Sequence, residues 1–576
     1  MARLNRLLTF FALLFTASLA GAEEATKSIA ERIDETVAPI AKWADGIIFY
    51  GFEVTDGVTM PIVLVVLGAT AVILTVYFKF INLRGFGIAL RTARGKYTPT
   101  DAPGEITHFQ ALSAALSATV GLGNIGGVAV AVGVGGPGAT FWMILMGLCG
   151  MTTKFAECTL GVKYRKIMKN GTVKGGGMYY LRDGFKEIGM GPLGAVLAVI
   201  FAVFVIGGAF GAGNMYQANQ AFDQLSNTFP SLGATAGSSD APVIFGAIMA
   251  VLVGMVIIGG IVSIARVTAF LVPFMCGMYM LAALVIIGGN LGELPAAIET
   301  IFSSAFSNEA VTGGLIGVLI QGIRRAAFSN EAGLGSAPIA HSAVKTNEPA
   351  SEGFVALLEP FVDTVVVCTM TALVIVITGT WQVSAEVNPG GTNLVKAAGS
   401  SEVVRVLEPG QYLHTRHTSG DQVEVIALIS STDRSAENVE GWVSAGAITS
   451  RSGVAVTSMA FGSVISWFPA ILTVAVILFA FSTMISWSYY GQQGVMYLFS
   501  FLGEDKIKIP VVIYKLIFCL VIIVGSSASL NNILMLSDAM VFAMVIPNLI
   551  GLYFLLPVIK RETVKFLAHV KSVEGK

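Results

Sequence analysis

The sequence predicts an all-α polytopic membrane protein of eleven spans: one preceding transmembrane helix, then an inverted five-plus-five helix repeat that carries a small β-rich extracytoplasmic insert. Composition indicates the membrane, because 54% of the 576 residues are hydrophobic and 12% are charged, whereas soluble proteins carry roughly 25% charged residues. Two apolar segments, residues 110–139 and 313–343, are interrupted by glycine, asparagine and hydroxyl residues. Each comes first in a set of five spans, and such paired interruptions are typical of inverted repeats.

Residues 1–22 have the pattern of a signal peptide. Two arginines precede an apolar centre, and an A-G-A sequence at the end provides small residues for cleavage. An uncleaved first helix is the alternative, since many helical bundle proteins insert without losing a signal. Residues 23–58 are polar and amphipathic, and we expect them to form an extracytoplasmic N-terminal segment.

Basic residues set the direction of the spans. The first span, residues 60–80, and a later one, residues 139–162, are each followed by a basic loop, which places both loops in the cytoplasm. The tail, residues 561–576, is basic as well, so the C-terminus is expected there and the N-terminus outside. We therefore expect a multi-pass protein of a bacterial-type inner membrane. The remaining spans are predicted at residues 192–220, 242–262, 265–289, 354–380, 458–498, 508–528 and 532–557.

The membrane core is predicted in two parts, residues 59–381 and 458–560, on either side of a soluble insert at 382–457. Two stretches of the insert, VEVIALIS and GWVSAGAI, alternate like short strands, and turn residues separate them. The Gly-Trp-Val sequence at 441–443 resembles a bacterial SH3-like β module. The sequence leaves open whether this insert binds a partner or is inert.

The middle of residues 110–139 carries four glycines around one asparagine, in the sequence TVGLGNIGG at 119–127. Glycine lets the backbone leave helical geometry, and unwound backbone inside a membrane needs partners for its carbonyl and N–H groups. A bound ion and a zwitterion are such partners. The glycines also match a dinucleotide-binding fingerprint, which requires a soluble βαβ unit and an acid about 20 residues later. Membrane-like flanks, and the lack of an acid in residues 139–148, argue against a nucleotide site.

Composition excludes further classes. A net charge of −1 gives no basis for binding nucleic acid. A membrane enzyme needs a buried acid–base or metal group, and five scattered histidines form no such pattern; a channel has no need for two matched broken helices. We therefore expect neither an enzyme nor a cofactor. The cysteines lie in apolar stretches without paired spacing and are interpreted as packing residues: Cys149, Cys158, Cys276, Cys368 and Cys519.

Five segments together resemble the alanine/glycine:cation symporter family: TVGLGNI at 119–125, GNMYQAN at 213–219, FSNEAGLGS at 328–336, FST at 481–483 and IPNL at 546–549. The resemblance covers about residues 60–560 except the insert. It implies the leucine-transporter fold and a sodium:alanine symporter that couples sodium influx to uptake of alanine or glycine by alternating access. The partners would be the small neutral amino acid, the coupling ion Na⁺ and the lipid bilayer.

The resemblance also implies the residues of the ion and substrate sites. Substrate contacts are expected from Thr119, Gly121, Gly123, Asn124, Gln217, Phe328, Asn330 and Gly333. Sodium ligands are expected from Ser117, Thr119, Val120, Asn124, Ser329, Ala480, Ser482 and Thr483. These offer carbonyl, amide and hydroxyl oxygens, which suit a hard cation, and we expect no acid in either cluster.

Several of these residues have a simpler alternative role. Asn124 would instead join two helices, Ser482 and Thr483 would bond within their own helix, and Gln217 would be ordinary packing. His341 is interpreted as an isolated packing residue.

Charged residues inside spans are functional candidates. We interpret six of them as structural pairs or gate residues on the cytoplasmic half: Arg324, Arg325, Glu331, Glu359, Asp363 and Asp538. Proton coupling is the alternative to sodium coupling, and it would centre on a membrane carboxylate, either Asp363 or Asp538.

Overall fold

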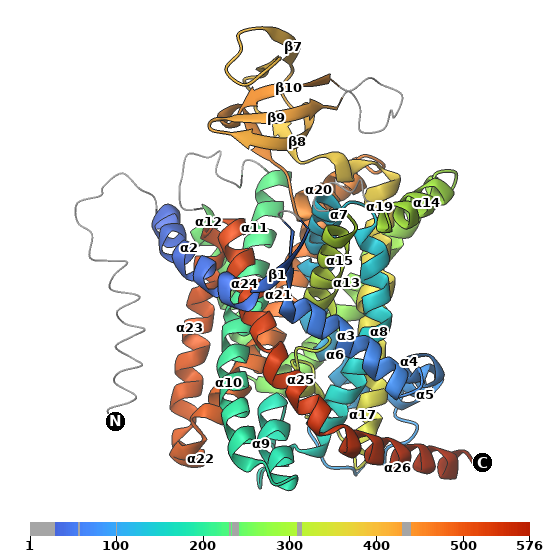
Figure 1. Ribbon diagram of the computed structural model, residues 1–576. Helices are drawn as coiled ribbons and strands as arrows, with labels where there is room; N and C mark the ends of the chain where they lie inside the picture. The colour runs from blue at the N-terminus through green and yellow to red at the C-terminus, as the bar shows by residue number, and fades with distance from the viewer. Residues whose placement is uncertain are drawn as a thin grey trace.

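The computed structural model describes residues 29–55, 58–99, 101–229, 232, 241–307, 314–428 and 439–575. Helices form one body, and a β domain stands at one end of it (Figure 1). The predominantly helical architecture agrees with the fold class predicted from the sequence. The predicted signal peptide, residues 1–22, lies outside the described residues.

The elements that precede the β domain are, in chain order, α2 (Ile29–Ile48), β1 (Gly51–Thr55), β2 (Val58–Pro61), α3 (Ile62–Tyr77), α4 (Ile81–Arg84), α5 (Phe86–Ala93), α6 (His108–Thr119), α7 (Val128–Gly135), α8 (Ala139–Lys163), β3 (Lys166–Ile167), β4 (Val173–Lys174), α9 (Gly177–Glu187), α10 (Gly191–Phe210), α11 (Tyr216–Thr228), α12 (Ala241–Ile257), α13 (Gly260–Gly289), α14 (Leu294–Ala305), α15 (Gly314–Asn330), α16 (Pro338–His341), α17 (Pro349–Ala356), α18 (Leu358–Pro360) and α19 (Thr369–Ile377). Those that follow it are α20 (Val454–Gly462), α21 (Phe468–Leu498), α22 (Gly503–Lys506), α23 (Lys508–Ser527), α24 (Leu530–Ala543), α25 (Val545–Phe554) and α26 (Leu556–Glu574). Three π-helical segments join neighbouring helices: η1 (Gly123–Gly127), η2 (Gly211–Met215) and η5 (Phe361–Cys368).

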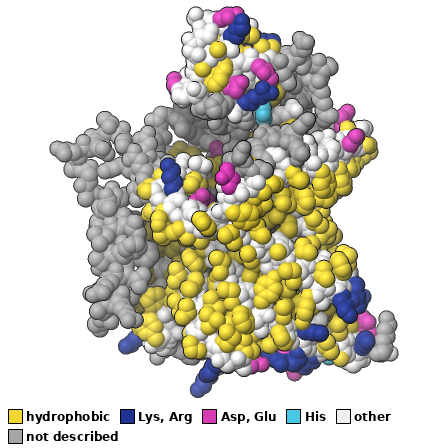
Figure 2. Space-filling view, in the orientation of Figure 1, with side chains coloured by type: hydrophobic (Ala, Val, Ile, Leu, Met, Phe, Trp, Pro, Cys, Tyr) yellow, Lys and Arg dark blue, Asp and Glu magenta, His cyan; other side chains and the backbone are white. Residues whose placement is uncertain are grey.

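The helical body has the length and surface of a multi-pass membrane protein. Among the described residues, seven helical stretches are long and apolar enough to cross a membrane, and the bent pair α6 and α7 makes an eighth. Two further apolar helices, α3 and α12, are shorter. Hydrophobic side chains cover the visible face of the body between its two ends (Figure 2). Eleven spans would require α3, α12 and the pair α15–α16 as well, and that number stays a prediction.

The first predicted interruption is present. α6 begins with a capping box, in which Thr107 Oγ1 accepts the Gln110 backbone N–H at 3.2 Å and Gln110 Oε1 accepts that of Thr107 at 3.0 Å. It ends at Thr119, and the chain bends by 52° before continuing through η1 into α7. Glycine is required at Gly126, because a Cβ there would lie 2.9 Å from Val454 Cγ2 on α20.

The second predicted interruption follows α15. Glu331, Gly333 and Gly335 have φ angles of +56°, +92° and +76°, in the left-handed region that a helix cannot use. The chain leaves α15 at Asn330 and resumes as the short helix α16. Both broken helices thus place unwound backbone in the middle of the body.

Three predicted boundaries are wrong. The predicted span 458–498 contains two helices, because α20 ends at residue 462 and α21 begins at residue 468. The boundary of the insert at residue 457 falls inside α20, whose Val454 and Thr457 are buried against the helical body. The tail predicted from residue 561 is the continuation of α26, which packs on α8 and α17.

The β domain is a seven-stranded antiparallel sheet in the order β11-β5-β8-β9-β10-β6-β7. Its alternating strands bury a small core of their own that includes Leu394, Leu407 and Val425. The SH3-like resemblance stays a prediction. The strands are β5 (Ala385–Val387), β6 (Thr392–Val395), β7 (Val403–Leu407), β8 (Tyr412–Ser419), β9 (Gln422–Ala427), β10 (Val439–Ser444) and β11 (Ile448–Ser450).

The three basic segments meet at the end of the body opposite the β domain, where α9 and α26 lie (Figure 1). Lys163 Nζ lies 2.6 Å from a carboxylate oxygen of Glu562, so the loop after α8 is tied to the C-terminal helix. Arg91 Nε lies 3.2 Å from Glu574, which ties the segment after α3 to the same helix. One end of the molecule therefore carries all three segments that the sequence assigns to the cytoplasm.

Candidate ion and substrate site

The break after α6 packs against α21 through hydroxyl groups and backbone carbonyls. Ser117 Oγ donates to the Ser482 carbonyl at 2.6 Å, and Thr483 Oγ1 donates to the Ser117 carbonyl at 3.0 Å. Ser486 Oγ donates to Ser117 Oγ at 3.1 Å. These four residues, here called the hydroxyl cluster, are buried and uncharged.

The other residues predicted beside this cluster lie on the same two helices. Val120 directly follows α6, and Ala480 lies one turn before Thr483 on α21; both are fully buried. Thr119 Oγ1 faces the carbonyls of its own helix at 3.4 Å. Ser482 Oγ also bonds within its helix, to the Phe479 carbonyl at 2.9 Å, so part of the simpler alternative holds for this hydroxyl.

A second group, here called the carboxylate cluster, lies on the other side of the break. Asn124 Nδ2 donates to Asp363 Oδ2 at 2.8 Å and to Ser329 Oγ at 3.0 Å. Ser329 Oγ in turn donates to Asp363 Oδ1 at 2.6 Å, and Thr364 Oγ1 donates to the same oxygen at 2.7 Å. The cluster joins η1, the end of α15 and η5, and all four residues are buried.

Asp363 corrects the expectation that no acid lies among the candidate ion ligands. The sequence links it to proton coupling or to a gate, whereas the structure places it in contact with Asn124 and Ser329. Cys368 lies there too, with Sγ 3.2 Å from Ser329 Oγ, so it is more than a packing residue. The partners are 239 and 34 residues from Asp363 along the chain, which explains why spacing did not connect them.

The carboxylate of Asp363 is fully buried, and none of the ion pairs within 4.0 Å among the described residues involves it. Lys154 acts on this carboxylate only from a greater distance. A buried carboxylate without a nearby cation is costly unless an ion or a proton neutralises it. The oxygens gathered here are those of the carboxylate and of the Ser329 and Thr364 hydroxyls, the ligand type that hard cations take. This donor set fits a small monovalent cation.

A small pocket lies beside the break of α6. Four of the residues predicted to contact substrate line it: Thr119, Gly123, Gln217 and Phe328. Phe328 covers the break, since a Cβ on Gly123 would lie 3.5 Å from its ring. Gln217 Oε1 accepts the Leu122 backbone N–H at 3.4 Å, so this glutamine braces the unwound segment as well as lining the pocket.

The remaining predicted substrate residues lie outside the pocket wall. Gly121 lies between the pocket and the hydroxyl cluster, because a Cβ there would be 2.6 Å from Thr483 Oγ1, and its N–H donates to Asn124 Oδ1. Asn330 and Gly333 do not line the pocket in this structure, and their contact with substrate stays a prediction. Asn330 Oδ1 accepts the Ala332 N–H at 3.0 Å, and Gly333 lies in the left-handed turn against Leu67 of α3.

Sequence reasoning missed two polar residues of the pocket wall, Glu331 and Trp487. Trp487 Nε1 donates to Glu331 Oε1 at 3.0 Å, and Ser336 Oγ donates to the other carboxylate oxygen. Glu331 is marked in the sequence as an intramembrane charge, but nothing local shows that it faces the pocket. The wall is completed by Ala118, Ala212 and Val541.

Two arginines lie behind the Phe328 wall of the pocket, on the side of α2. Arg324 Nε and Arg325 Nη2 lie 2.8 Å and 2.7 Å from the same Asp538 oxygen. Arg325 also lies over the Phe328 ring, 5.5 Å from its centroid. The predicted pairing is present. Arg324 also reaches Asp45 of α2 at 3.6 Å, in the half that carries the β domain and not at the end where the three basic segments meet.

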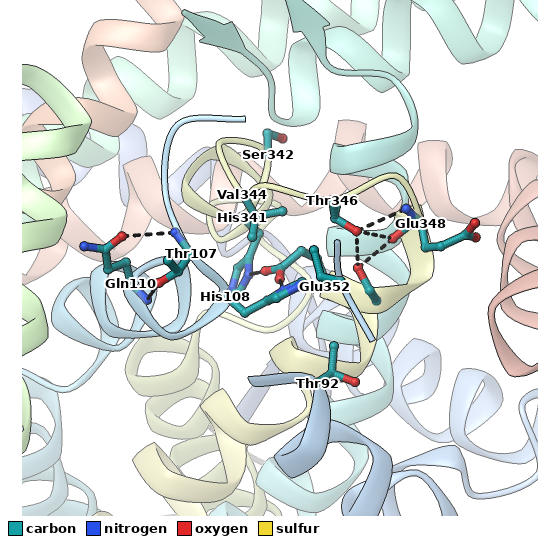
Figure 3. Close-up of polar contacts among 12 residues, drawn as sticks. Thr92, Thr107, His108, Gln110, His341, Ser342, Val344, Thr346, Glu348 and Glu352 are labelled. Atoms are coloured by element: carbon teal, nitrogen blue, oxygen red, sulfur yellow. Dashed lines mark hydrogen bonds and ion pairs between the residues drawn. The ribbon is translucent and has the colours of Figure 1, made fainter. Parts of the chain in front are cut away.

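Charged residues also lie between the pocket and the opposite end. His341 is not isolated, because Glu352 and Glu359 contact its two ring nitrogens. Lys154 Nζ lies 2.9 Å from Glu359 Oε2, and His108 contacts Glu352 (Figure 3). The expectation for His341 is wrong because its partners, 11 and 18 residues later, lie on the separate helices α17 and α18 and not within its own helix.

A multi-pass body with two broken helices around a closed polar pocket defines a membrane transporter. The chain belongs to the sodium:alanine symporter family, which it matches over residues 49–409 and 435–576. This is a family of transporters and not an enzyme class. The match includes most of the β domain, so the resemblance extends further than the sequence segments alone indicated.

Relatives span most of the chain. The sodium/alanine symporter AgcS of Methanococcus maripaludis is 37% identical over 517 residues, which cover 90% of this chain and 96% of that protein. The putative sodium/proton-dependent alanine carrier protein YrbD of Bacillus subtilis is 38% identical over 49% of this chain and 54% of its own length. The crystal structure of MhsT in complex with L-phenylalanine is 13% identical, with a TM-score of 0.46, over 80% of this chain and 99% of that chain.

Proposed function

We propose that this protein is a secondary active symporter that couples sodium influx to uptake of alanine, glycine or both by alternating access. The observation that carries the proposal is the buried carboxylate of Asp363 beside the pocket. Among the described residues, no cationic side chain forms an ion pair with this carboxylate within 4.0 Å. The family of the chain and the name of AgcS support a sodium-coupled alanine transporter.

Sodium would bind in both clusters around the break of α6. In the carboxylate cluster, Asp363 and Ser329 would supply oxygens, and the negative charge would compensate the ion. Asn124 would contribute its amide oxygen only after the side chain turns, because its amide nitrogen now faces Asp363. In the hydroxyl cluster, Thr483, Ser482 and the carbonyls near Ser117 and Ala480 would form a neutral site, joined by Thr119 and Val120. The two sites would hold the break from opposite sides.

The pocket between the clusters would hold the amino acid. Its carboxylate would meet N–H groups of the unwound segment at Gly121–Asn124, where a helix N-terminus favours an anion. Its ammonium would meet carbonyls at the end of α15. The rings of Phe328 and Trp487 limit the room for a side chain, which favours alanine and glycine over larger residues.

Ion binding would close the transporter by joining separate elements. The residues of the carboxylate cluster come from three segments, η1, α15 and η5. An ion bound there would favour the conformation in which these three segments meet. A ligand shifts such an equilibrium only through its different affinities for the two states. The Arg324/Arg325–Asp538 contacts over Phe328 would then form the extracytoplasmic gate.

The topology that supports this cycle has eleven spans in a leucine-transporter fold, with two inverted five-span repeats after α3. The N-terminus and the β domain would be extracytoplasmic and α26 cytoplasmic, in an inner membrane. The clustering of the three basic segments at one end supports this orientation.

Proton coupling is the second candidate. The name of YrbD includes both cations, and a proton on Asp363 would neutralise its charge as sodium would. Asp538 is the weaker proton carrier, because two arginines already compensate its charge.

Uptake of labelled alanine into proteoliposomes tests the proposal. We expect uptake under an inward sodium gradient and none when choline replaces sodium, with glycine as a competitor. Uptake that does not depend on sodium but is driven by a pH gradient would show that the transporter is coupled to protons. No uptake under either gradient would contradict the substrate.

A further inference from the structure

A chain of polar side chains runs from the basic end of the body to its buried centre. Thr98, which is partly exposed in the loop before α6, lies 2.6 Å from His108 Nε2. His108 Nδ1 contacts one oxygen of Glu352, and His341 Nδ1 contacts the other (Figure 3). The path continues through Glu359 to Lys154, and every residue after Thr98 is at most 3% exposed.

The geometry at His341 requires a proton. Its Nδ1 faces Glu352 Oε2 and its Nε2 faces Glu359 Oε1 at 2.7 Å. A neutral imidazole has one N–H and one lone pair, so one of these nitrogens would point a lone pair at a carboxylate. Both contacts become hydrogen bonds when the ring carries two N–H groups. A proton is therefore held between these three side chains.

Among Lys154, His341, Glu352 and Glu359, the charges balance when that proton is on the ring. His108 extends the chain of contacts from Glu352 to Thr98. Loss of the proton would leave two buried carboxylates with one lysine, which is unfavourable in a low-dielectric interior.

Other charged and titratable groups face this chain from the surrounding helices. Glu157 and Cys158 of α8, Glu331 after α15, Asp363 of η5 and Tyr490 of α21 surround Lys154 and Glu359. Arg165, after α8, faces Glu352. None of these groups lies between the two nitrogens of His341 and their carboxylate partners.

The same residues hold the start of α6. His108 is the first residue of α6, Glu352 belongs to α17, and His341 ends α16. Arg165 binds the segment after α16 through the Ser342, Val344 and Thr346 carbonyls; burial lowers the pKa of this guanidinium to about 10, so it stays charged near neutral pH. The α6 start cannot move away from α17 without breaking the His108–Glu352 contact.

We propose that His341, held between Glu352 and Glu359, is a proton-binding site whose occupancy keeps the start of α6 on α17 and thereby closes the cytoplasmic side. The proposal rests on the orientation given under Proposed function, but it goes beyond sodium coupling. Because the closed state binds the proton, a rise in cytoplasmic pH removes it and favours opening; a one-proton site changes the closed-to-open ratio by at most tenfold per pH unit.

The first test uses the purified full-length protein in detergent without sodium or amino acid. We expect the Tm of the wild type to fall as pH rises from 6 to 9.5, and His341→Gln to lose this fall. His569→Gln, at a histidine of α26 outside the chain of contacts, is the matched control and should keep the wild-type profile. A flat wild-type profile, or an unchanged fall in His341→Gln, would overturn the proposal.

A second variant keeps the proposal testable if His341→Gln does not fold. Glu352→Gln removes one of the two carboxylates that retain the proton, so the fall in Tm should begin at a lower pH. A purely structural role would lower the Tm at every pH without moving this midpoint, and that result would overturn the proposal. These measurements need no transport, so a wrong substrate or coupling ion would leave them interpretable.

Vesicles then test the closure. With external pH fixed, raising the internal pH from 6.5 to 8.5 should change the rate of alanine uptake by the wild type, in right-side-out vesicles, and leave His341→Gln unaffected. Equal responses of the two proteins would contradict a role of this proton in opening.

Discussion

The two polar clusters that flank the break of α6 use different chemistry on the two faces of one unwound segment. The carboxylate cluster contains an acidic side chain, that of Asp363 from η5, which can carry a full negative charge. The hydroxyl cluster consists of hydroxyls and carbonyls of α6 and α21. A charged ligand interacts with a cation more strongly than a neutral one in a buried site. The comparison therefore predicts a dominant site with Asp363 and a weaker one with Thr483.

Asp363→Asn should have the largest effect. The amide keeps the shape and most hydrogen bonds but removes the charge, so the sodium concentration for half-maximal uptake should rise about 10- to 100-fold, as expected for an interaction of about 1.5–3 kcal/mol with a charged group. Sodium titration of alanine uptake measures it. Asp183→Asn, in a partly exposed pair with Arg182, is the matched control. Unchanged sodium activation in Asp363→Asn would remove this carboxylate from the ion site.

Thr483→Ala should have a smaller effect of the same kind. Removal of a neutral hydroxyl ligand should raise the half-activating sodium concentration about 2- to 10-fold. Ser488→Ala, on the same helix with a hydroxyl bonded to the Ile485 carbonyl, is the control and should match the wild type. An effect larger than that of Asp363→Asn would reverse the ranking of the two clusters.

Phe328→Ala distinguishes the role of the pocket from that of the ion sites, because it should change substrate selectivity but not sodium activation. The ring covers the break at Gly123, so its removal should admit neutral amino acids with larger side chains, with a several-fold gain in their competition against alanine. Sodium activation of the remaining alanine uptake should change little, because Phe328 supplies no charged ligand. Competition assays at saturating sodium measure the first effect, and a strict preference for alanine in this variant would contradict the assigned wall.

Removal of sodium should produce the smallest of these effects, a small decrease in the Tm of the wild type. An ion that binds the folded state stabilises it by RT ln(1 + [L]/Kd), so sodium should raise the Tm of the wild type by about one degree or more. Choline at equal ionic strength is the control. The increment should vanish in Asp363→Asn and persist in part in Thr483→Ala. An equal increment in both variants would show that the ion binds elsewhere.

The sequence predicted the parts of this arrangement that are local. Glycines around Asn124 predicted the first break, because this signal lies within a few residues. Ser482 and Thr483 were assigned through the family resemblance of the segment at 481–483, and the structure places them against Ser117 of α6. Asp363 and His341 could not be assigned in this way. Each has partners from other helices, so the sequence shows an intramembrane polar residue but not what neutralises it.

Two departures from the sequence prediction have a related physical cause. Asn330 and Gly333 lie in the segment that resembles a pocket-lining helix, but the Asn330 amide contacts Thr364 and the Ala332 N–H, and Gly333 lies in a left-handed turn against α3. The end of the β insert was misplaced because α20 is apolar like a span, yet it packs under the β domain as a short separate helix. Local composition predicts burial, whereas the direction of an unwound chain depends on the neighbours it contacts.

Simultaneous measurement of sodium and alanine fluxes tests the central claim most directly. Proteoliposomes with the wild-type protein would receive labelled sodium and labelled alanine together, with no membrane potential and equal pH on both sides. The account predicts that alanine and sodium enter in a fixed ratio, and that Asp363→Asn lowers both fluxes together. Alanine entry without any accompanying sodium would contradict it.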